Sequence, residues 1–508
     1  MNRGRTLWSL GGTLLVAGAF GIGTWFGEQR VHARGEWADA RLLSTAIDSV
    51  RVNALDSLPS DELIRRAVAG MLRELQDPYA AIMRPDGYQR YRGSLQGDAQ
   101  GLGLTLRRQG SNVTVSRVAA GSPAAVAGTR AGDRVLMVND VPIAQGWGRT
   151  EADTSTAPLE LANLVLWRAP DGDTVRVSVR PGAWHARAVS DAAMLTDSVA
   201  YVRLSSITAQ TSSELEHAVD SLQAHGAESL ILDLRGNAGG LFEEGVRAAG
   251  LFLKRGLVVA SLDGRRGSAP EPHYAKKSRW TTMPITVLVD AGTASAAEVI
   301  AAALRDHRRA LIVGTPTYGK GVVQRVVKLT PELSMRLTTA RWLTPNGVSL
   351  ERRHGVGRDA KGGMIPDVLL DDAVRRDAFA LPRDWSGDAV AAVSSAADSA
   401  SVHALREGWT TLALPSLESR LQERILTAIP RTLRGDAMRA AWLNVGTRLA
   451  TVRALEAAGE LDALLRYSVR EDGALRAGLD VLEPGSNLVR VTPSSVPDAV
   501  TARRTSPR

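Results

Sequence analysis

The segment from Ile285 to Gln324 constrains the fold of this chain more than any other part of the sequence. The apolar run Ile285–Val289 is short enough to be a buried strand, and a turn that contains a glycine follows it. Ala294–His307 is rich in alanine and predicts a helix, and Ala310–Val313 predicts a second strand. Strands and helices that alternate in this way are typical of an α/β fold.

Ser295 lies in the first turn of the predicted helix. A hydroxyl on rigid backbone at this point suits a nucleophile, because the free N–H groups of a first helical turn can stabilise a developing oxyanion. A serine nucleophile also needs a base. His307 lies at the far end of the same helix and cannot turn back to Ser295, whereas Lys320, flanked by Gly319 and Gly321, can act as a base if it is held neutral.

The basic residues of the chain are strongly biased, with six Lys against 56 Arg. Because Arg does not release its proton in a protein, a basic side chain that serves as general base has to be Lys. Lys320 between two glycines is therefore informative. From the residues alone, two structural interpretations stay open: Ser295 as a small helix-packing residue, and Lys320 as a solvated loop charge.

The same residues resemble the core of the C-terminal processing peptidases, which are serine proteases with a Ser-Lys dyad and a PDZ domain. Ser295 lies three positions before Glu298, and Lys320 lies in a Gly-Lys-Gly loop 25 positions after Ser295, as in that family. Gln324, four positions after the lysine, matches the residue that orients the amine. The resemblance implies that Ser295 is the nucleophile, Lys320 the base and Gln324 its orienting partner. The family often has Ser-Ala-Ser-Ala-Ser-Glu here, and the chain departs from it at Thr293 and Ala297 but keeps Ser295 and Glu298.

A Gly-rich turn at Asp233–Gly240 follows a predicted strand, Ser229–Leu234. Taken alone, such a turn could bind an anion or be merely tight. The resemblance places one oxyanion donor at the N–H of Gly239, with Gly240 as the neighbouring possibility, and the second at the N–H of Ala296. The family fold implied for the core is a spiral of ββα units, similar to the crotonases and to ClpP.

A PDZ domain is the expectation for the residues before this core. A Gly-rich start, a strand at Val113–Val118, and the string Ala127–Asp133 before a strand at Arg134–Val138 resemble PDZ domains of bacterial proteases. Successive small residues let backbone N–H groups face a terminal carboxylate. A groove helix is expected over Pro158–Trp167. The residues predicted to bind peptide are Gly101, Leu102, Gly103, Leu104, Leu161 and Val165.

The N-terminal segment Leu7–Phe26 carries no charge over 20 residues, which is enough to span a bilayer as a helix. Arg3 and Arg5 precede it, so the rest of the chain is expected outside the cytoplasm. An uncleaved inner-membrane anchor is favoured over a cleaved signal, because the residues after the apolar run give a poor cleavage site. The sequence thus predicts a periplasmic, or otherwise extracytoplasmic, catalytic part.

Composition excludes several other classes of protein. The chain has no cysteine, which rules out disulfides, Cys nucleophiles and Cys-ligated metals. The HExxH zinc motif and the GxxxxGK[ST] phosphate loop are both absent, and no metal site or cofactor is predicted. The net charge is +8, but no basic run is interleaved with aromatic residues, so no nucleic acid partner is expected.

The predicted domain organisation has seven parts. They are an anchor or signal segment (1–30), a helical segment (38–92), the PDZ domain (97–182), the protease core (183–372), a linker (386–401), a helical region (402–482) and a disordered tail (483–508). Extra helical regions in the family serve dimerisation or substrate tethering, so a homo-oligomer is one expectation. Leu417, Leu421 and Ile425 form one apolar stripe in the helical region.

The function expected from these features is a serine endopeptidase that cleaves exported or unfolded proteins with free C-termini. Two alternatives from other classes stay open at this point. A catalytically silent PDZ adaptor would need Ser295 or Lys320 to be lost, and both are present. A crotonase-type acyl-CoA enzyme would share the core fold, but the PDZ domain and the Gly-Lys-Gly loop argue against it.

Overall fold

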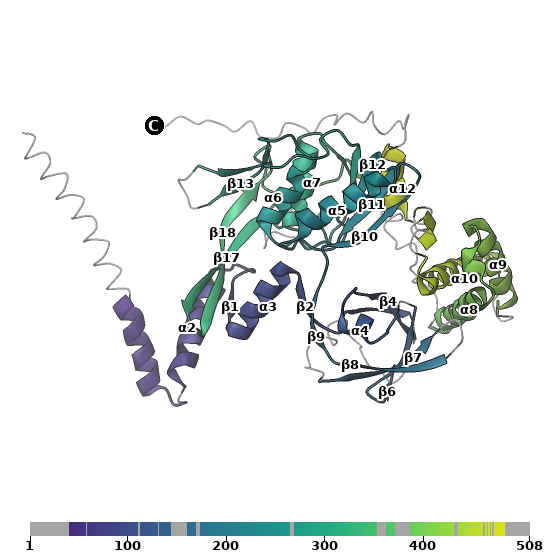
Figure 1. Cartoon of the computed structure of the whole chain (residues 1–508). Helices are drawn as coiled ribbons and strands as arrows, with labels where there is room; N and C mark the ends of the chain where they lie inside the picture. The colour runs from purple at the N-terminus through teal and green to yellow at the C-terminus, as the bar shows by residue number, and fades with distance from the viewer. Residues whose placement is uncertain are drawn as a thin grey trace, which may run out of the picture. The chain divides into compact units, whose positions relative to one another are not determined.

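The computed structural model describes residues 40–56, 58–109, 112–130, 132–143, 160–168, 173–264, 269–352, 362–370, 387–430, 435–460, 463–464, 466–467, 469 and 472–482 (Figure 1). The predicted anchor at Leu7–Phe26 and the predicted tail at 483–508 lie outside these residues. Among the helices of the described part, none has the length and apolar character to cross a bilayer. The chain divides into two compact units: Met1–Pro85 with Gln324–Thr338, and the remainder.

The larger unit contains a six-stranded sheet that carries the predicted catalytic core. Its strand order is β10-β11-β12-β15-β16-β19, and all neighbours are parallel except β10 and β11. The strands are β10 (Val189–Met194), β11 (Val199–Leu204), β12 (Ser229–Asp233), β15 (Ile285–Val289), β16 (Leu311–Gly314) and β19 (Val368–Leu369). The predicted α/β class is therefore what this unit forms.

Both faces of this sheet are covered, which explains why its central strands are apolar throughout. Leu230 and Leu232 of β12 pack in the core formed with α5 (Thr211–Ala224), α6 (Phe242–Gly250) and α7 (Ala296–Asp306). Ile231 points to the opposite face, because side chains alternate along a strand. There it packs with α12 (Gly473–Leu482), from the end of the described chain.

A second sheet of the larger unit corresponds to the predicted PDZ region. Its order is β3-β4-β5-β7-β8, with β6 paired to β5. The elements are β3 (Leu104–Gln109), β4 (Asn112–Val118), β5 (Arg134–Val138), β6 (Val141–Pro142), β7 (Ala162–Arg168), β8 (Asp173–Val179) and the short helix α4 (Pro123–Val126). The chain enters and leaves this region through β2 (Asp98–Gly101) and β9 (Gly182–His185), which pair antiparallel.

The groove helix expected over Pro158–Trp167 is wrong for the part that the structure describes. Ala162–Arg168 forms β7, which pairs antiparallel with both β5 and β8. Val165 is a buried strand residue, whereas Leu161 precedes the strand and is exposed. A short apolar run fits either a helix or a strand by periodicity alone, and here pairing with two neighbouring strands decided the outcome.

The larger unit also holds β13 (Val258–Asp263) and β14 (Glu271–Tyr274), which pair antiparallel, and β13 pairs with the end of β18 (Leu333–Leu343). Helix α3 (Pro85–Gln96) precedes the PDZ region. In the smaller unit, residues 40–53 are helical, α2 (Ser60–Glu74) follows, and β1 (Ala81–Met83) pairs with the first part of β18. β17 (Val322–Thr330) also pairs with β18. Within the described residues of 38–92, the expected helices are found at 40–53, 60–74 and 85–92, and the turns between them and β1 are not helical.

Three long helices follow the catalytic sheet in the sequence: α8 (Gly387–Arg406), α9 (Leu414–Thr427) and α10 (Asp436–Ala458). The linker expected at Ser386–Ser401 is wrong, because Gly387–Arg406 is helical. Its small residues serve close packing instead: Val393, Ala397 and Ala404 are fully buried in the core shared with α9 and α10. The stripe predicted in α9 is confirmed as core, since Leu417, Leu421 and Ile425 are all buried.

Candidate active site

Ser295 lies at the junction between β15 and α7, on a backbone that residues with a side chain rarely adopt. Its φ is 56° and its ψ is −122°. Such strain persists only where the surroundings over-determine it, and it is frequent at functional sites. The preceding turn supplies that constraint: Asp290 Oδ1 accepts hydrogen bonds from the N–H groups of Gly236, Gly292 and Thr293 at 2.8, 2.9 and 3.1 Å. The half-buried Ser295 therefore lies on a fixed elbow.

Glu298, in the first turn of α7, is fully buried and accepts four hydrogen bonds. Its Oε2 accepts from the backbone N–H groups of Ser295 at 2.8 Å and Lys320 at 2.9 Å. Its Oε1 accepts from the N–H of Gly319 at 2.8 Å and from the hydroxyl of Thr317 at 2.5 Å. One carboxylate thus fixes the backbone of the candidate nucleophile and that of the candidate base.

In the sequence Glu298 marks only the spacing from Ser295, and its role as a shared acceptor was not predicted. A Glu three residues after a Ser at a helix start has the spacing of a capping box, in which the Glu side chain accepts the N-cap backbone N–H. That half of the motif is present here, as the bond from the Ser295 N–H. The further bonds to the loop at Gly319 and Lys320 join residues about 20 positions apart and had no local signal.

The loop that carries Lys320 has further contacts within the larger unit. Trp342 Nε1 donates to the carbonyl of Lys320 at 2.9 Å, and the N–H of Arg352 donates to the carbonyl of Gly319 at 2.9 Å. Trp342 is itself buried, so this anchor is rigid. Lys320 is half-buried, and both its backbone N–H and its backbone carbonyl are held by hydrogen bonds, to Glu298 and Trp342 respectively.

Gln324, the predicted third member, lies in β17 and belongs to the smaller unit. Its Nε2 lies 3.5 Å from the hydroxyl of Thr338 in that unit. The proposal that Gln324 orients the amine of Lys320 stays a prediction.

Gly239, the predicted oxyanion donor, lies directly against the elbow at Ser295. A Cβ added to Gly239 would be 2.8 Å from Ser295 Cβ, 2.9 Å from Ala296 N and 2.6 Å from the carbonyl oxygen of Ala294. Its φ of +88° also favours glycine. Ala296 is the first residue of α7, where backbone N–H groups have no intrahelical partner. The structure therefore brings Gly239, Ser295 and Ala296 together.

In this structure the N–H of Gly239 is already used within its own loop. It donates to Asn237 Oδ1 at 2.9 Å, while Asn237 Nδ2 donates to the carbonyl of Leu204 at 2.9 Å. Asn237 is buried, so it fixes the loop to the end of β11. A substrate oxyanion would have to share or replace the bond to Asn237.

A buried charge cluster supports the start of the same loop, and sequence reasoning assigned it no role. Asp233 is fully buried, accepts from Tyr201 Oη at 2.8 Å, and binds Arg235 Nη2 at 2.7 Å. Burial acts to raise the pKa of Asp233, but the charge and hydrogen bonds of Arg235 outweigh it, and the pKa lies below its ordinary value. Burial raises the pKa of Tyr201, and the neighbouring charge of Asp233 adds to this.

The predicted peptide-binding loop of the PDZ region lies between β2 and β3. The carbonyl of Leu102 accepts from the N–H of Ala124 at 3.0 Å, and that of Gly103 accepts from Ala119 at 2.9 Å. Gly103 has a φ of +77°, and a Cβ there would overlap the side chain of Ser122. Leu102 and Leu104 pack against the core of the domain. The loop is thus closely fitted, and binding of a peptide there stays a prediction.

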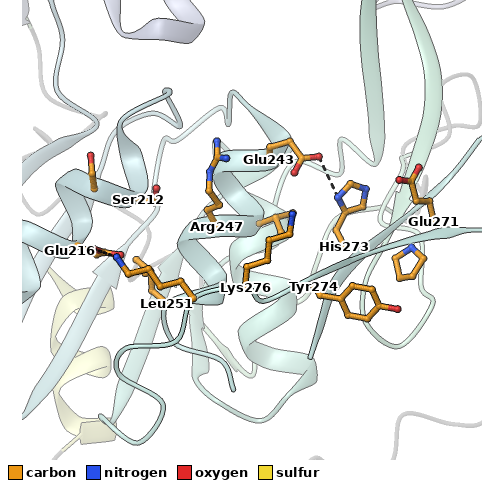
Figure 2. Close-up of a pocket in the computed structure, with 13 residues that line it drawn as sticks. Ser212, Glu216, Glu243, Arg247, Leu251, Glu271, His273, Tyr274 and Lys276 are labelled. Carbon is orange, nitrogen blue, oxygen red and sulfur yellow. Dashed lines mark hydrogen bonds and ion pairs between the residues drawn. The ribbon is translucent and has the colours of Figure 1, made fainter. Parts of the chain in front are cut away.

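A cavity of about 550 Å³ lies elsewhere on the larger unit, between α5, α6 and β14 (Figure 2). Glu243 and His273 face one another across it, with Glu243 Oε1 3.3 Å from His273 Nδ1. Neither Ser295 nor Lys320 nor Gly239 lines this cavity. The candidate catalytic residues therefore lie outside it. Within the described residues, no group of three or more His, Asp or Glu side chains could hold a metal ion.

Comparison with known proteins agrees with the resemblance. The profile of peptidase family S41 matches residues 198–362, and that of a PDZ domain matches residues 114–156. The carboxy-terminal processing protease CtpA of Bacillus subtilis (strain 168) is 30% identical over 327 residues, which are 64% of this chain and 69% of that protein. A probable CtpA-like serine protease of Staphylococcus aureus (strain N315) is 30% identical over 313 residues, 61% of each chain.

Among solved structures, the photosystem II D1 C-terminal processing protease is 30% identical, covers 64% of this chain and 86% of its own, and has a TM-score of 0.40. The family expected from the Ser295, Lys320 and Asp233–Gly240 motifs is confirmed by the family profile and the curated relatives. The chain belongs to peptidase family S41, and it is a serine peptidase of the C-terminal processing type with a PDZ domain.

Proposed function

We propose that Ser295 is the nucleophile of this peptidase and that neutral Lys320 is its general base. Ser295 Oγ attacks the peptide carbonyl carbon while its proton passes to Lys320 Nζ. Lys320 then gives this proton to the leaving amine, and the C–N bond breaks to leave an ester on Ser295. Water attacks the ester with Lys320 again as base, which releases the carboxylate product and restores Ser295. Gln324 orients the amine of Lys320.

The negative charge of the tetrahedral intermediate is held, in this proposal, by the N–H groups of Gly239 and Ala296. Two observations support this assignment. A Cβ added to Gly239 would lie 2.8 Å from Ser295 Cβ and 2.9 Å from Ala296 N, and Ala296 lies at a helix N-terminus. Gly240 is the alternative donor.

The observation that carries the proposal is the set of hydrogen bonds to Glu298. The candidate nucleophile and the candidate base lie 25 positions apart, yet their backbone N–H groups donate to the same oxygen. A packing role for Ser295 or a solvated role for Lys320 would not require a buried carboxylate at that junction. Burying a carboxylate costs free energy unless it is fully hydrogen-bonded, and here four donors meet that need.

The substrates in this proposal are exported or unfolded proteins with free C-termini, which the PDZ domain captures or admits to the active site. The match of a PDZ profile to residues 114–156 supports this role. We also propose that Leu7–Phe26 anchors the enzyme in the inner membrane with its catalytic part in the periplasm, on the strength of the uncharged run and of Arg3 and Arg5. Assembly as a homo-oligomer belongs to the same proposal.

The proposed function is tested by incubating the purified protein with an unfolded substrate that has a free C-terminus. The wild type should cleave it, and Ser295→Ala should fold but not cleave, because the neighbouring alanines already accommodate a small side chain. Cleavage by a folded Ser295→Ala protein would contradict the assignment of the nucleophile. For the anchor, the full-length protein should stay with membranes through a carbonate wash, and a mature N-terminus between Gly27 and Trp37 would show cleavage instead.

A further inference from the structure

Helix α12 is separated from the catalytic sheet by more than 100 residues of sequence, yet it packs directly on it (Figure 1). Leu475 and Val481 are buried against Leu288 of β15 and Val313 of β16. Gly478 lets the helix approach closely, because a Cβ there would lie 3.0 Å from Leu288 Cδ2. The helix is therefore an integral part of the core that carries the site.

Asp472, immediately before α12, uses its two carboxylate oxygens for two different contacts. Oδ1 accepts from the N–H groups of Ala474 at 3.0 Å and Leu475 at 3.1 Å, which is the arrangement of a helix N-cap. Oδ2 accepts from Arg235 Nη1 at 2.7 Å, and both side chains are mostly buried, at 26% and 20% exposed. The cap of α12 thus continues into an ion pair with the catalytic core.

Arg235 connects Asp472 to the candidate oxyanion loop, because it binds Asp472 and lies in the Asp233–Gly240 turn. Its Nε and Nη2 groups bind Asp233, at 3.0 and 2.7 Å, so Arg235 lies between two carboxylates. Four residues later the same loop reaches Gly239. Asp233 lies in β12 and is fixed by the sheet, so Asp472 is the partner of Arg235 that belongs to a separate element.

We propose that Asp472 is a positioning residue for the oxyanion loop, acting through Arg235, and that α12 is thereby part of the catalytic unit. This inference rests on the proposed role of Gly239. The charge of Asp472 holds the guanidinium of Arg235 in one orientation, and the backbone from Arg235 to Gly239 keeps its place beside Ser295. Loss of this charge lowers the rate of the chemical step and leaves the binding of substrate unchanged.

The test compares Asp472→Asn with Asp480→Asn in the full-length protein. Asn caps a helix about as well as Asp, so Asp472→Asn can keep α12 capped through its one oxygen, while its amide group replaces the charged acceptor that faces Arg235. Asp480 is exposed on the same helix and gives the matched control. We expect kcat on a short peptide to fall at least about tenfold in Asp472→Asn, a part of the loss seen when an oxyanion donor is removed, with KM unchanged. Hydrogen exchange of residues 473–482 should remain as slow as in the wild type.

Three results would overturn this inference. The first is a kcat of Asp472→Asn equal to that of Asp480→Asn. The second is a rise in KM with unchanged kcat, which would assign Asp472 to substrate binding. The third is fast exchange of α12 in Asp472→Asn, which would mean that the ion pair holds the helix and not the loop. Failure of the proposed function is distinguishable, because it would appear as cleavage by Ser295→Ala whatever the state of Asp472.

Discussion

The backbone N–H of Lys320 donates to Glu298 Oε2 at 2.9 Å, on the same oxygen that accepts the N–H of Ser295. Two loops that follow different strands of the sheet therefore share one acceptor. Their separation is fixed by a single buried side chain, and this makes Glu298 the residue whose replacement should disturb both loops together.

Glu298→Gln replaces one acceptor oxygen with an amide group that can only donate. At least one backbone N–H would then face another donor in a buried site, which costs about 1–3 kcal/mol for each unsatisfied group. We expect the free energy of unfolding in urea to fall by about 2 kcal/mol, and kcat to fall by about 100-fold, since small misplacements of reacting groups have effects of that size. Glu228→Gln, at an exposed site, is the control. Full activity of Glu298→Gln would mean that the hydrogen bonds from Ser295 and Lys320 to Glu298 are not needed for catalysis.

Lys320→Arg separates base chemistry from simple charge. Arg keeps the positive charge and remains protonated, so it cannot accept the proton of Ser295. We expect Lys320→Arg to be as inactive as Lys320→Ala, with a loss of about 10²–10⁴-fold, and the rate of the wild type to rise with pH as the neutral form of Lys320 becomes populated. Gln324→Ala should be milder, because it removes orientation only. An active Lys320→Arg enzyme with an unchanged pH profile would refute the dyad.

Gly239→Ala and Gly236→Ala form a matched pair on the oxyanion loop. Both positions have positive φ, +88° and +71°, so both variants carry a backbone cost of about 1–2 kcal/mol. Only Gly239→Ala also places a methyl group 2.8 Å from Ser295 Cβ, since the space around Gly236 is open. We expect peptide cleavage to be abolished in Gly239→Ala and to remain measurable in Gly236→Ala. Equal rates in the two variants would argue against a catalytic position for Gly239.

Asp233→Asn should change how stability depends on pH. The pKa of Asp233 in the folded protein lies below its ordinary value of 3.8, so its ionised form contributes stability above that value. This contribution is lost as the pH falls through the lower pKa of the folded state. Removing one partner of a buried ion pair costs about 3–5 kcal/mol, so urea unfolding at pH 7 should show a loss of about 3 kcal/mol that shrinks below pH 3.8.

The control for this measurement is Asp220→Asn, which breaks an exposed pair with Arg279. Exposed pairs contribute about 0–1 kcal/mol, so its stability should follow the wild type across the pH range. A constant difference between wild type and Asp233→Asn down to acid pH would contradict the lowered pKa of Asp233.

Sequence reasoning predicted best where a segment had its own periodicity and its own turn signals. Ile285–Val289 and Arg134–Val138 form strands with the predicted bounds. It failed at Ala162–Arg168, where pairing with two strands overrode a helical spacing. It also failed at Gly387–Arg406. The small residues there resemble those of a linker, but they allow α8 to pack closely in the core shared with α9 and α10.

For the candidate site, the sequence predicted the residue types that carry chemistry and missed those that hold them in place. Ser295, Ala296 and Gly239 come together as expected, because motifs of the family mark them. The contact between Arg235 and Asp472 joins residues 237 positions apart and has no local pattern. Burial of Glu298 likewise depends on the packing of α7 against the sheet. Periodicity indicates that packing, but it does not identify the hydrogen-bond partners of Glu298.

The cover that α12 provides also sets an order of events during synthesis. A chain completed only to residue 460 already contains the whole segment that matches the S41 profile, residues 198–362. In such a chain, Ile231, Leu288 and Val313 lack the side chains of Leu475 and Val481 that cover them. Domains generally fold as they emerge, beginning from the N-terminus. The sheet of this peptidase therefore lacks the α12 cover of one apolar face until residues 473–482 have been made, more than 100 residues after the S41 segment is complete.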